Sequence, residues 1–331
     1  MDLSRFPRRH YTPGPTPLQP LPRLSKELGA TIYIKRDDLL GLTAGGNKTR
    51  KLEFLMAEAL ASGATDIITT GAVQSNHCRL TLAAAVTEGC AAHLLLHERV
   101  PGTYSPEAGG NNLLYRLLGA ATIEVAPATA DLGARMAEMA EELRAAGRTP
   151  YIIPGGGSVA LGALGYAAAA QEILAQSFAA GLPIDHIVTP SVSGGTHAGL
   201  VAGSIGLGAS WTITGISADE PAADQEAKVL QLARDAAVLA GIDREIPESA
   251  VTVREEFIGP GYSLPSPAMT EAVQLFARTE GILLDPVYSG KAASGLIAMA
   301  RAGEFDGGTA LFLHTGGSPA TYHYRSQVLP S

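Results

Sequence analysis

The chain has few cysteines, and their spacing argues against a disulfide. Only two of its 331 residues are cysteines, Cys78 and Cys90. If a helix joins them, they lie ~18 Å apart at ~1.5 Å per residue, whereas a disulfide needs Cα atoms within ~7 Å. We therefore expect no structural disulfide, and a reducing, cytoplasmic location fits this cysteine usage.

Aromatic residues and positive charge are also scarce. Aromatics make up 5% of the chain, and its formal net charge is −8. Nucleic-acid-binding proteins usually carry the opposite sign, and single-strand binders add aromatic platforms, so neither class is expected. No C-x-x-C or H-E-x-x-H spacing indicates a metal site. No apolar run reaches the ~18 residues of a membrane span, and the polar, proline-rich start lacks the apolar region of a signal peptide.

Hydrophobic residues are abundant, at 46%. Segments with the hydrophobic pattern of a strand alternate along the chain with segments that have the spacing of a helix. Such alternation of strands and helices predicts an α/β fold with a mainly parallel sheet covered on both faces. The predicted strands are 31–35, 66–70, 92–96, 122–125, 150–153, 186–190, 211–217 and 309–314. The predicted helices are 47–62, 76–88, 131–146 and 161–179. We further predict a smaller α/β domain at 50–160, inserted into a larger domain of 1–49 plus 161–331.

The first segment that could carry chemistry is Gly45–Lys51, GGNKTRK. With Gly41 it comes close to a nucleotide-binding P-loop, but Asn47 stands where that motif needs lysine. Alternatively, Lys48 begins a helix, whose positive end lowers the pKa of an ammonium and suits a lysine that attacks an aldehyde as the neutral amine. A solvated lysine at a helix start is the simpler interpretation of Lys48 alone. Lys51, one turn on, is the rival candidate for the lysine that attacks the aldehyde.

The second and third segments are turns that each follow a strand and begin a helix. In Gly71–His77, Ser75 and Asn76 precede exposed helix N–H groups that favour a carboxylate or phosphate, although Ser75 could equally be an ordinary helix cap. His77 alone is more often structural. In 192–196, VSGGT, glycines and hydroxyls form a predicted anion nest. This turn contains no lysine, so backbone N–H groups and hydroxyls would hold a phosphate there; the alternative is a tight turn that merely needs glycine.

The last two segments lie near the C-terminus. Tyr262 and Tyr288 stand in glycine- and proline-rich stretches, where active-site residues tend to lie. Thr315 follows the last predicted strand, at the sheet edge where α/β proteins bind ligands. Packing at the edge of the core would explain either tyrosine alone, and a helix cap would explain Thr315.

Together these segments resemble pyridoxal-phosphate enzymes of the tryptophan-synthase-β fold type. Within that type, the chain is similar to the group of D-cysteine desulfhydrase, L-cysteate sulfo-lyase and aminocyclopropane-carboxylate deaminase. GGNKTRKLEFL (Gly45–Leu55), QSNH (Gln74–His77) and EGILLDPVYSGK (Glu280–Lys291) carry the resemblance, which runs over nearly the whole chain. It implies two open, mainly parallel sheets covered by helices, a site in the cleft between the two domains, and a homodimer.

The resemblance also implies a role for each site residue. Lys48 would bind the aldehyde of pyridoxal 5'-phosphate and later move the α-proton, while Asn76 would hydrogen-bond the ring hydroxyl and Thr315 would face the ring nitrogen. The predicted catalytic residues are Lys48, Ser75, Tyr262 and Tyr288. The predicted cofactor-binding residues are Lys48, Asn76, Val192, Ser193, Gly194, Gly195, Thr196 and Thr315. The predicted substrate-binding residues are Ser75, Asn76 and His77.

Two positions separate the members of this group. The deaminases carry Glu where this chain has Ser289, and Leu where it has Thr315. A hydroxyl beside the ring nitrogen makes a weaker electron sink than a carboxylate does, which suffices when a good β-leaving group departs. The resemblance therefore favours β-elimination from D-cysteine to pyruvate, sulfide and ammonia. L-cysteate is the close alternative, with Arg79 or Arg99 as a second cation for its sulfonate. Less favoured are a cyclopropane deaminase, a P-loop-like nucleotide-binding module and an inactive relative that acts as a scaffold.

Overall fold

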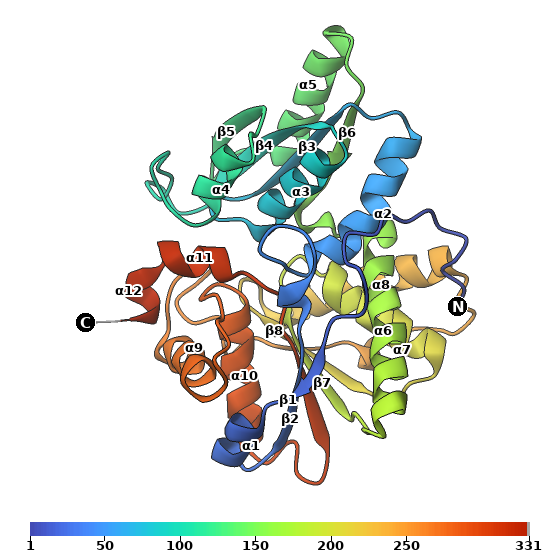
Figure 1. Ribbon diagram of the computed structural model, residues 1–331, viewed down its shortest axis with the longest axis vertical. Helices are drawn as coiled ribbons and strands as arrows, with labels where there is room; N and C mark the ends of the chain where they lie inside the picture. Colours follow the sequence, from blue (N-terminus) through green and yellow to red (C-terminus); the bar gives the residue numbers. More distant parts are fainter. Residues whose placement is uncertain (330–331) are drawn as a thin grey trace.

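Two separate β-sheets organise the chain, as the computed structural model, which describes residues 1–329, shows (Figure 1). The larger sheet has the strand order β1-β2-β10-β7-β8-β9. Its strands are β1 (Leu18–Pro20), β2 (Thr31–Lys35), β7 (His186–Ser191), β8 (Thr212–Ser217), β9 (Thr252–Arg254) and β10 (Thr309–Leu313). Only β1 runs antiparallel to its neighbour, so the sheet is mainly parallel.

The smaller sheet is parallel throughout and has the order β5-β4-β3-β6. Its strands are β3 (Asp66–Ala72), β4 (Ala91–Glu98), β5 (Thr122–Pro127) and β6 (Pro150–Ile153). All four fall within residues 50–160, the predicted smaller domain. The exact domain bounds stay a prediction.

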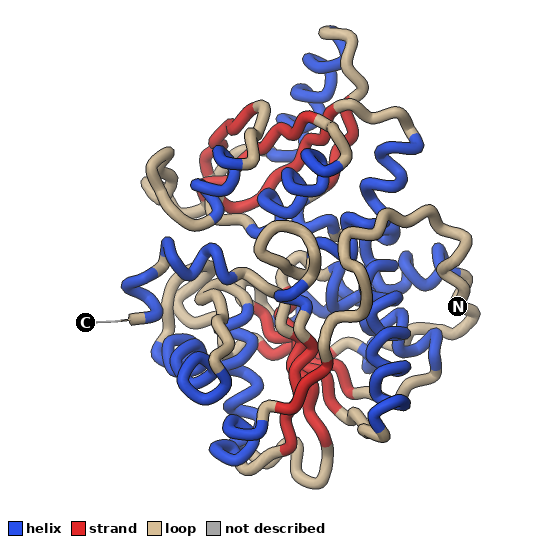
Figure 2. Tube along the Cα trace, viewed as in Figure 1, coloured by secondary structure: helices blue, strands red, loops and turns tan. Residues whose placement is uncertain are grey.

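Helices cover both faces of each sheet (Figure 2). The helices are α1 (Pro22–Leu28), α2 (Lys48–Ala61), α3 (Asn76–Thr87), α4 (Asn111–Leu117), α5 (Leu132–Ala145), α6 (Ala160–Ala180), α7 (Gly195–Leu207), α8 (Ala222–Ala240), α9 (Pro267–Glu280), α10 (Ser289–Arg301), α11 (Ser318–His323) and α12 (Arg325–Val328). Short 3₁₀ turns occur at Asp37–Leu39, Gly155–Gly157 and Glu248–Ala250. On the larger sheet, α6, α7 and α8 pack on one face, and α1, α9 and α10 on the other. On the smaller sheet, α2, α3 and α4 lie against one face and α5 against the other.

Helix α2 lies between the two sheets, because it packs against α6 on one side and α3 on the other. Apolar residues at helical spacing, such as Leu52, Leu55 and Met56, join the core beneath the smaller sheet. Contact on both sides also buries charged residues of the helix, Arg50 and Lys51 among them. The segment that carries the predicted active-site lysine is therefore held from two directions.

The predicted strands and helices are all present, with ends shifted by at most two residues. Both cysteines are buried and free, as their spacing predicted. Among residues 1–329, no helix combines the length and apolar character that crossing a membrane requires. The short strands β1 and β9 and the helices α1, α4 and α8 to α12 have no counterpart among the predicted elements.

Candidate active site

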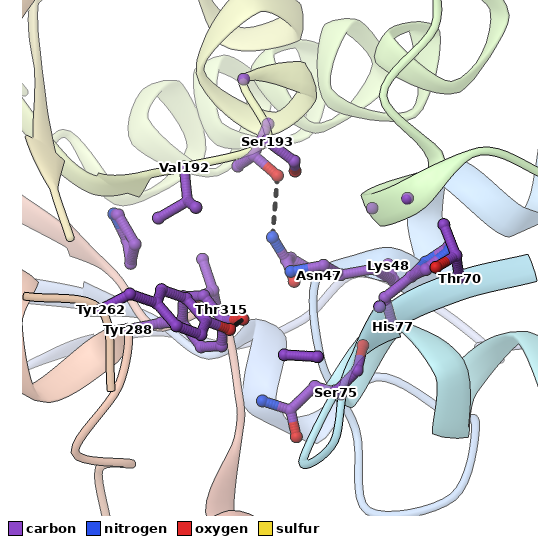
Figure 3. A pocket seen from close by; sticks show the side chains of 18 of the residues that line it. Asn47, Lys48, Thr70, Ser75, His77, Val192, Ser193, Tyr262, Tyr288 and Thr315 are labelled. Carbon is purple, nitrogen blue, oxygen red and sulfur yellow. Dashed lines mark hydrogen bonds between the residues drawn. The ribbon is translucent and has the colours of Figure 1, made fainter. Parts of the chain in front are cut away.

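The predicted site residues converge on one cavity of about 280 Å³ (Figure 3). It lies where the carboxyl ends of β3, β7 and β10 meet, which is where parallel α/β sheets bind ligands. Its size is close to the lower end of small-molecule pockets, ~300 Å³. The predicted residues that line it are Lys48, Ser75, Asn76, His77, Val192, Ser193, Gly194, Thr196, Tyr262, Tyr288 and Thr315. Gly195, the first residue of α7, is buried and does not line the cavity.

Lys48 is the first residue of α2 and lines the cavity. Its pKa is lowered to about 8, chiefly by burial; Asp285 opposes this shift and Arg79 adds to it. Its Nζ lies 5.4 Å from the ring centre of Tyr288, and among residues 1–329 it forms no ion pair. An amine with this pKa is partly neutral near pH 7 and can attack an aldehyde.

Asn47 fixes the position of Lys48 relative to the other walls of the cavity. Its backbone N–H donates to Thr315 O at 3.1 Å, and its Nδ2 donates to Thr196 Oγ1 at 2.8 Å, the dashed line in Figure 3. Gly45, just upstream, has a φ of +63°, and a side chain there would collide with Asp38 O. In the sequence Asn47 was only a mismatch to a P-loop; in the structure it links three of the site segments.

The turn from Val192 to Thr196 forms a second wall. Gly194 has a φ of +85°, and the chain turns sharply there from β7 into α7. The N-terminus of α7 therefore lies at the cavity. Ser158 braces the turn from the opposite loop: its Oγ donates to Ser193 Oγ at 2.9 Å and accepts from Gly195 N at 3.2 Å. Backbone N–H groups at a helix N-terminus are suited to an anion such as phosphate.

Lys51 places a buried amine next to this turn, in addition to the backbone groups and hydroxyls that we expect to hold a phosphate there. Its Nζ donates to Gly156 O at 3.1 Å and to Ser158 Oγ at 3.2 Å, and it lies 2.8 Å from where a Cβ on Gly195 would stand. Burial lowers its pKa well below the usual value, and Lys48 adds to the shift. Lys51 has no carboxylate partner within residues 1–329, so an anion at the turn would supply one. The sequence missed it because Lys51 and Gly195 meet only in the fold.

We expect Lys51→Met to weaken cofactor binding about 10- to 100-fold, because a hydrogen bond to a charged group contributes ~1.5–3 kcal/mol. The measurement is the dissociation constant of pyridoxal 5'-phosphate, obtained by titrating the apoprotein. Lys26→Met, on the surface of α1, is the matched control and should bind the cofactor as the wild type does. Equal affinity in the two variants would contradict a phosphate contact for Lys51.

Ser75 and Asn76 form the wall at the start of α3. Ser75 Oγ accepts a hydrogen bond from Cys78 N at 3.1 Å, so this residue caps its helix and also lines the cavity. Asn76 Oδ1 accepts from Arg79 at 2.9 Å and from Asn111 at 3.0 Å. Both partners occupy the amide oxygen, which leaves Asn76 Nδ2 as a donor for a ligand.

His77 lines the same wall, but its ring nitrogens face the protein. Nε2 lies 2.8 Å from Thr69 Oγ1, and Nδ1 lies 3.5 Å from Thr81 Oγ1. Burial keeps the pKa of the imidazole well below its usual value, so the ring is neutral. The predicted substrate contact of His77 stays a prediction.

Tyr262 and Tyr288 lie together at the opposite wall (Figure 3). Their hydroxyls form a hydrogen bond with each other. Tyr288 immediately precedes α10, and the buried Asp285 fixes it by accepting hydrogen bonds from the N–H groups of Val287, Tyr288 and Ser289 at 2.9 Å each. Burial raises the pKa of both phenols, so each holds its proton. The two hydroxyls can donate a proton, but neither is ionised at neutral pH and so neither can act as a phenolate base.

Thr315 follows β10 and brings a hydroxyl group to the cavity. Ser289, the other position that separates the subgroups, does not line it; its Oγ donates to Asp285 Oδ1 at 2.7 Å. No aspartate or glutamate lines the cavity in the part of the chain that the structure describes.

These residues fit pyridoxal 5'-phosphate. The cavity combines a partly neutral amine at Lys48, an amide donor at Asn76 and an anion turn with a second buried amine, Lys51, behind it. An aldehyde, a ring hydroxyl and a phosphate are the groups that such a set would bind. A nucleotide has no aldehyde for Lys48, and the fold does not bring that lysine into a P-loop.

Comparison with known proteins agrees with this chemistry. The family model described as pyridoxal-phosphate dependent enzyme matches residues 10–316. The solved structure of an ACC deaminase homologue is 40% identical, with a TM-score of 0.88, and the match covers 98% of this chain and 96% of that one. Threonine deaminase from T.th. (21% identity, TM-score 0.61, 93% and 92% covered) and O-ureido-L-serine synthase (17%, 0.65, 96% and 94%) share the fold. The chain is therefore a member of the pyridoxal-phosphate-dependent enzyme family, with the two-sheet fold of its type II members.

Proposed function

We propose that the protein is a carbon–sulfur lyase that converts D-cysteine and water to pyruvate, hydrogen sulfide and ammonia. The observation that carries the proposal is the absence of any carboxylate from the described walls of the cavity, where Thr315 presents a hydroxyl group instead. Bound pyridoxal phosphate supplies an electron sink for the carbanion at the substrate α-carbon. Without a carboxylate to protonate the ring nitrogen that sink is weak, which suits elimination of a good β-leaving group better than opening of a cyclopropane ring.

Binding and orientation would come from the two helix N-termini and Asn76. The N–H groups at the start of α3, with Ser75, would bind the substrate carboxylate, and those of 193–196, with Lys51, would bind the cofactor phosphate. Asn76 Nδ2 would donate to the ring hydroxyl, because Arg79 and Asn111 hold the amide in that orientation. Arg79 is thus a positioning residue.

Proton movement would depend on Lys48 and the two tyrosines. Lys48 Nζ would take the α-proton as the neutral amine, which its lowered pKa permits. The hydroxyls of Tyr288 and Tyr262 would hand a proton to the departing sulfur. Both phenols hold their protons at neutral pH, and Tyr288 lies beside Lys48.

The cations near the cavity favour sulfide over sulfite as the leaving group. A sulfonate substrate needs a second cation. Arg79 donates to Asn76, Asn111 and the backbone oxygens of Thr43 and Gly45, and it does not line the cavity. Arg99 does line the cavity, but Asp219 neutralises it. A thiol needs no such partner.

We expect the rate at which the apoprotein captures pyridoxal 5'-phosphate to rise with pH through about 8 and then level off. The neutral form of Lys48 is the reactive one, and its pKa is lowered to about 8, so raising the pH through that value deprotonates it. The measurement is the rate at which the covalent chromophore appears at each pH. A midpoint near that of an ordinary lysine, ~10.4, would contradict the assignment.

The proposed function is tested by a substrate panel. D-cysteine, L-cysteine, L-cysteate and aminocyclopropane carboxylate are each supplied to the holoenzyme, and the keto-acid product is measured. The proposal predicts pyruvate and sulfide from D-cysteine, with little product from the others. Oxobutanoate from the cyclopropane would instead assign the deaminase activity for which the 40% identical relative is named. Colour without any keto acid would indicate an inactive scaffold. The predicted homodimer would be tested separately, by light scattering.

A further inference from the structure

Arg99 and Asp219 form an ion pair between the two sheets. Arg99 directly follows β4 of the smaller sheet, and Asp219 follows β8 of the larger one. The pair is bidentate: Nη1 lies 2.7 Å from Oδ2, and Nη2 lies 3.0 Å from Oδ1. The side chains are 35% and 16% exposed, so the pair is only partly accessible to solvent.

Arg99 belongs to the wall of the active-site cavity as well as to this pair. Its Cζ lies 4.2 Å from the ring centre of Tyr262, whose hydroxyl bonds to that of Tyr288 beside Lys48. Within residues 1–329, Lys48 and Arg99 are the only lysine or arginine side chains that line the cavity. Arg99 and Tyr262 also line an adjoining cavity of about 330 Å³, so they stand between the two spaces.

This arrangement gives Asp219 a definite effect on what can bind. Among the described residues that line the cavity, Arg99 is the cation nearest to hand for an anionic group beside Tyr262, and Asp219 already accepts from both of its Nη atoms and neutralises its charge. The same carboxylate would repel the arriving anion. An uncharged group, such as a thiol, meets neither obstacle.

We infer that Asp219 sets the charge selectivity of the site: by holding Arg99, it excludes amino acids whose β-substituent is an anion, such as a sulfonate. The inference rests on the proposed function, since it concerns the β-substituent of an amino-acid substrate. Removing the charge of Asp219 leaves Arg99 beside the cavity without its partner. Arg99 is then free to bind a sulfonate, without any change to Lys48 or to the turn at 193–196.

The test compares two ligands that lack an amine and so cannot replace Lys48 on the cofactor aldehyde. These are 3-sulfopropanoate, which carries the sulfonate, and 3-mercaptopropanoate, which carries the thiol. Their dissociation constants are measured by calorimetry on the holoenzyme of the wild type and of Asp219→Asn. We expect the ratio of the two constants to shift toward the sulfonate by about fivefold or more in the variant, since opposite charges ~4 Å apart interact by at least ~1 kcal/mol even in water.

Two further variants show whether the shift acts through Arg99. Glu271→Gln, which breaks an exposed pair with Arg301, removes the same charge elsewhere and should leave the ratio at its wild-type value. The double variant Arg99→Gln with Asp219→Asn should lose the shift. If Asp219→Asn binds 3-sulfopropanoate no more tightly than the wild type, or if the double variant keeps the gain, the inference is wrong.

The outcome is separable from that of the proposed function. Turnover of D-cysteine by the wild type tests the function, whereas the ligand ratio needs no turnover. A shifted ratio in an enzyme that does not act on D-cysteine would retain the role of Asp219 and reject the lyase. An unshifted ratio in an active D-cysteine lyase would retain the lyase and reject the role of Asp219.

Discussion

Replacing Lys48 by alanine should abolish turnover, with a loss of more than about 10³-fold in kcat, because one side chain both binds the cofactor aldehyde and moves the α-proton. No other amine can take its place in the described part of the chain. Lys51 Nζ donates hydrogen bonds to Gly156 O and Ser158 Oγ, next to the turn at 193–196. The measurement is pyruvate release from D-cysteine under saturating cofactor.

The cofactor should still bind to Lys48→Ala, since the turn at 193–196, Lys51 and Asn76 all remain. Its spectrum should be that of free pyridoxal phosphate, and its affinity should be reduced. Lys26→Ala on the surface of α1 should retain full activity as the control. Full activity in Lys48→Ala would show that the lysine assignment is wrong, and Lys51 would be the next to replace.

Replacing Arg50 by leucine should destabilise the fold by about 3–5 kcal/mol, the range for breaking one side of a buried ion pair. Arg50 is 2% exposed and binds both oxygens of the buried Asp37 at 2.8 Å and Glu172 at 2.8–2.9 Å. The buried Lys35 also pairs with Glu172. Without Arg50, Asp37 keeps hydrogen bonds from Tyr166 and Thr16 but loses the cation bonded to both of its oxygens.

The free energy of unfolding of Arg50→Leu is obtained from urea titration of the apoprotein. Arg301→Leu breaks a pair whose side chains are 52% and 50% exposed, and should cost less than ~1 kcal/mol. Similar losses in the two variants would contradict a structural role for the buried cluster. Because Arg50 lies two residues after Lys48, the first turn of α2 should also become more mobile, as amide exchange would report.

The site segments that the sequence predicted best are those in which a strand, a turn and a helix follow one another. The strand predicted at 66–70 and the helix at 76–88 became β3 and α3, with Ser75 as the cap between them. Likewise, 186–190 and VSGGT became β7 and the turn into α7. The chemistry of such a turn is local, because its glycines and hydroxyls are adjacent in the chain.

The contacts that the sequence could not predict join residues far apart in the chain. Lys51 meets Ser158 and Gly195 only because α2 packs against α6. Arg99 was a candidate sulfonate ligand in the sequence, and only the fold showed that Asp219 holds it. The hydrogen bond between Tyr262 and Tyr288 likewise depends on how the loop before α9 folds over α10. Periodicity indicates which face of an element is buried, but it does not name the partner.

The most direct test of the account is to reconstitute the protein with pyridoxal 5'-phosphate, reduce it with borohydride and locate the modified residue by peptide mass spectrometry. The account predicts a single modified lysine, Lys48. A label on Lys51 or on another lysine, or no covalent label at all, would contradict it.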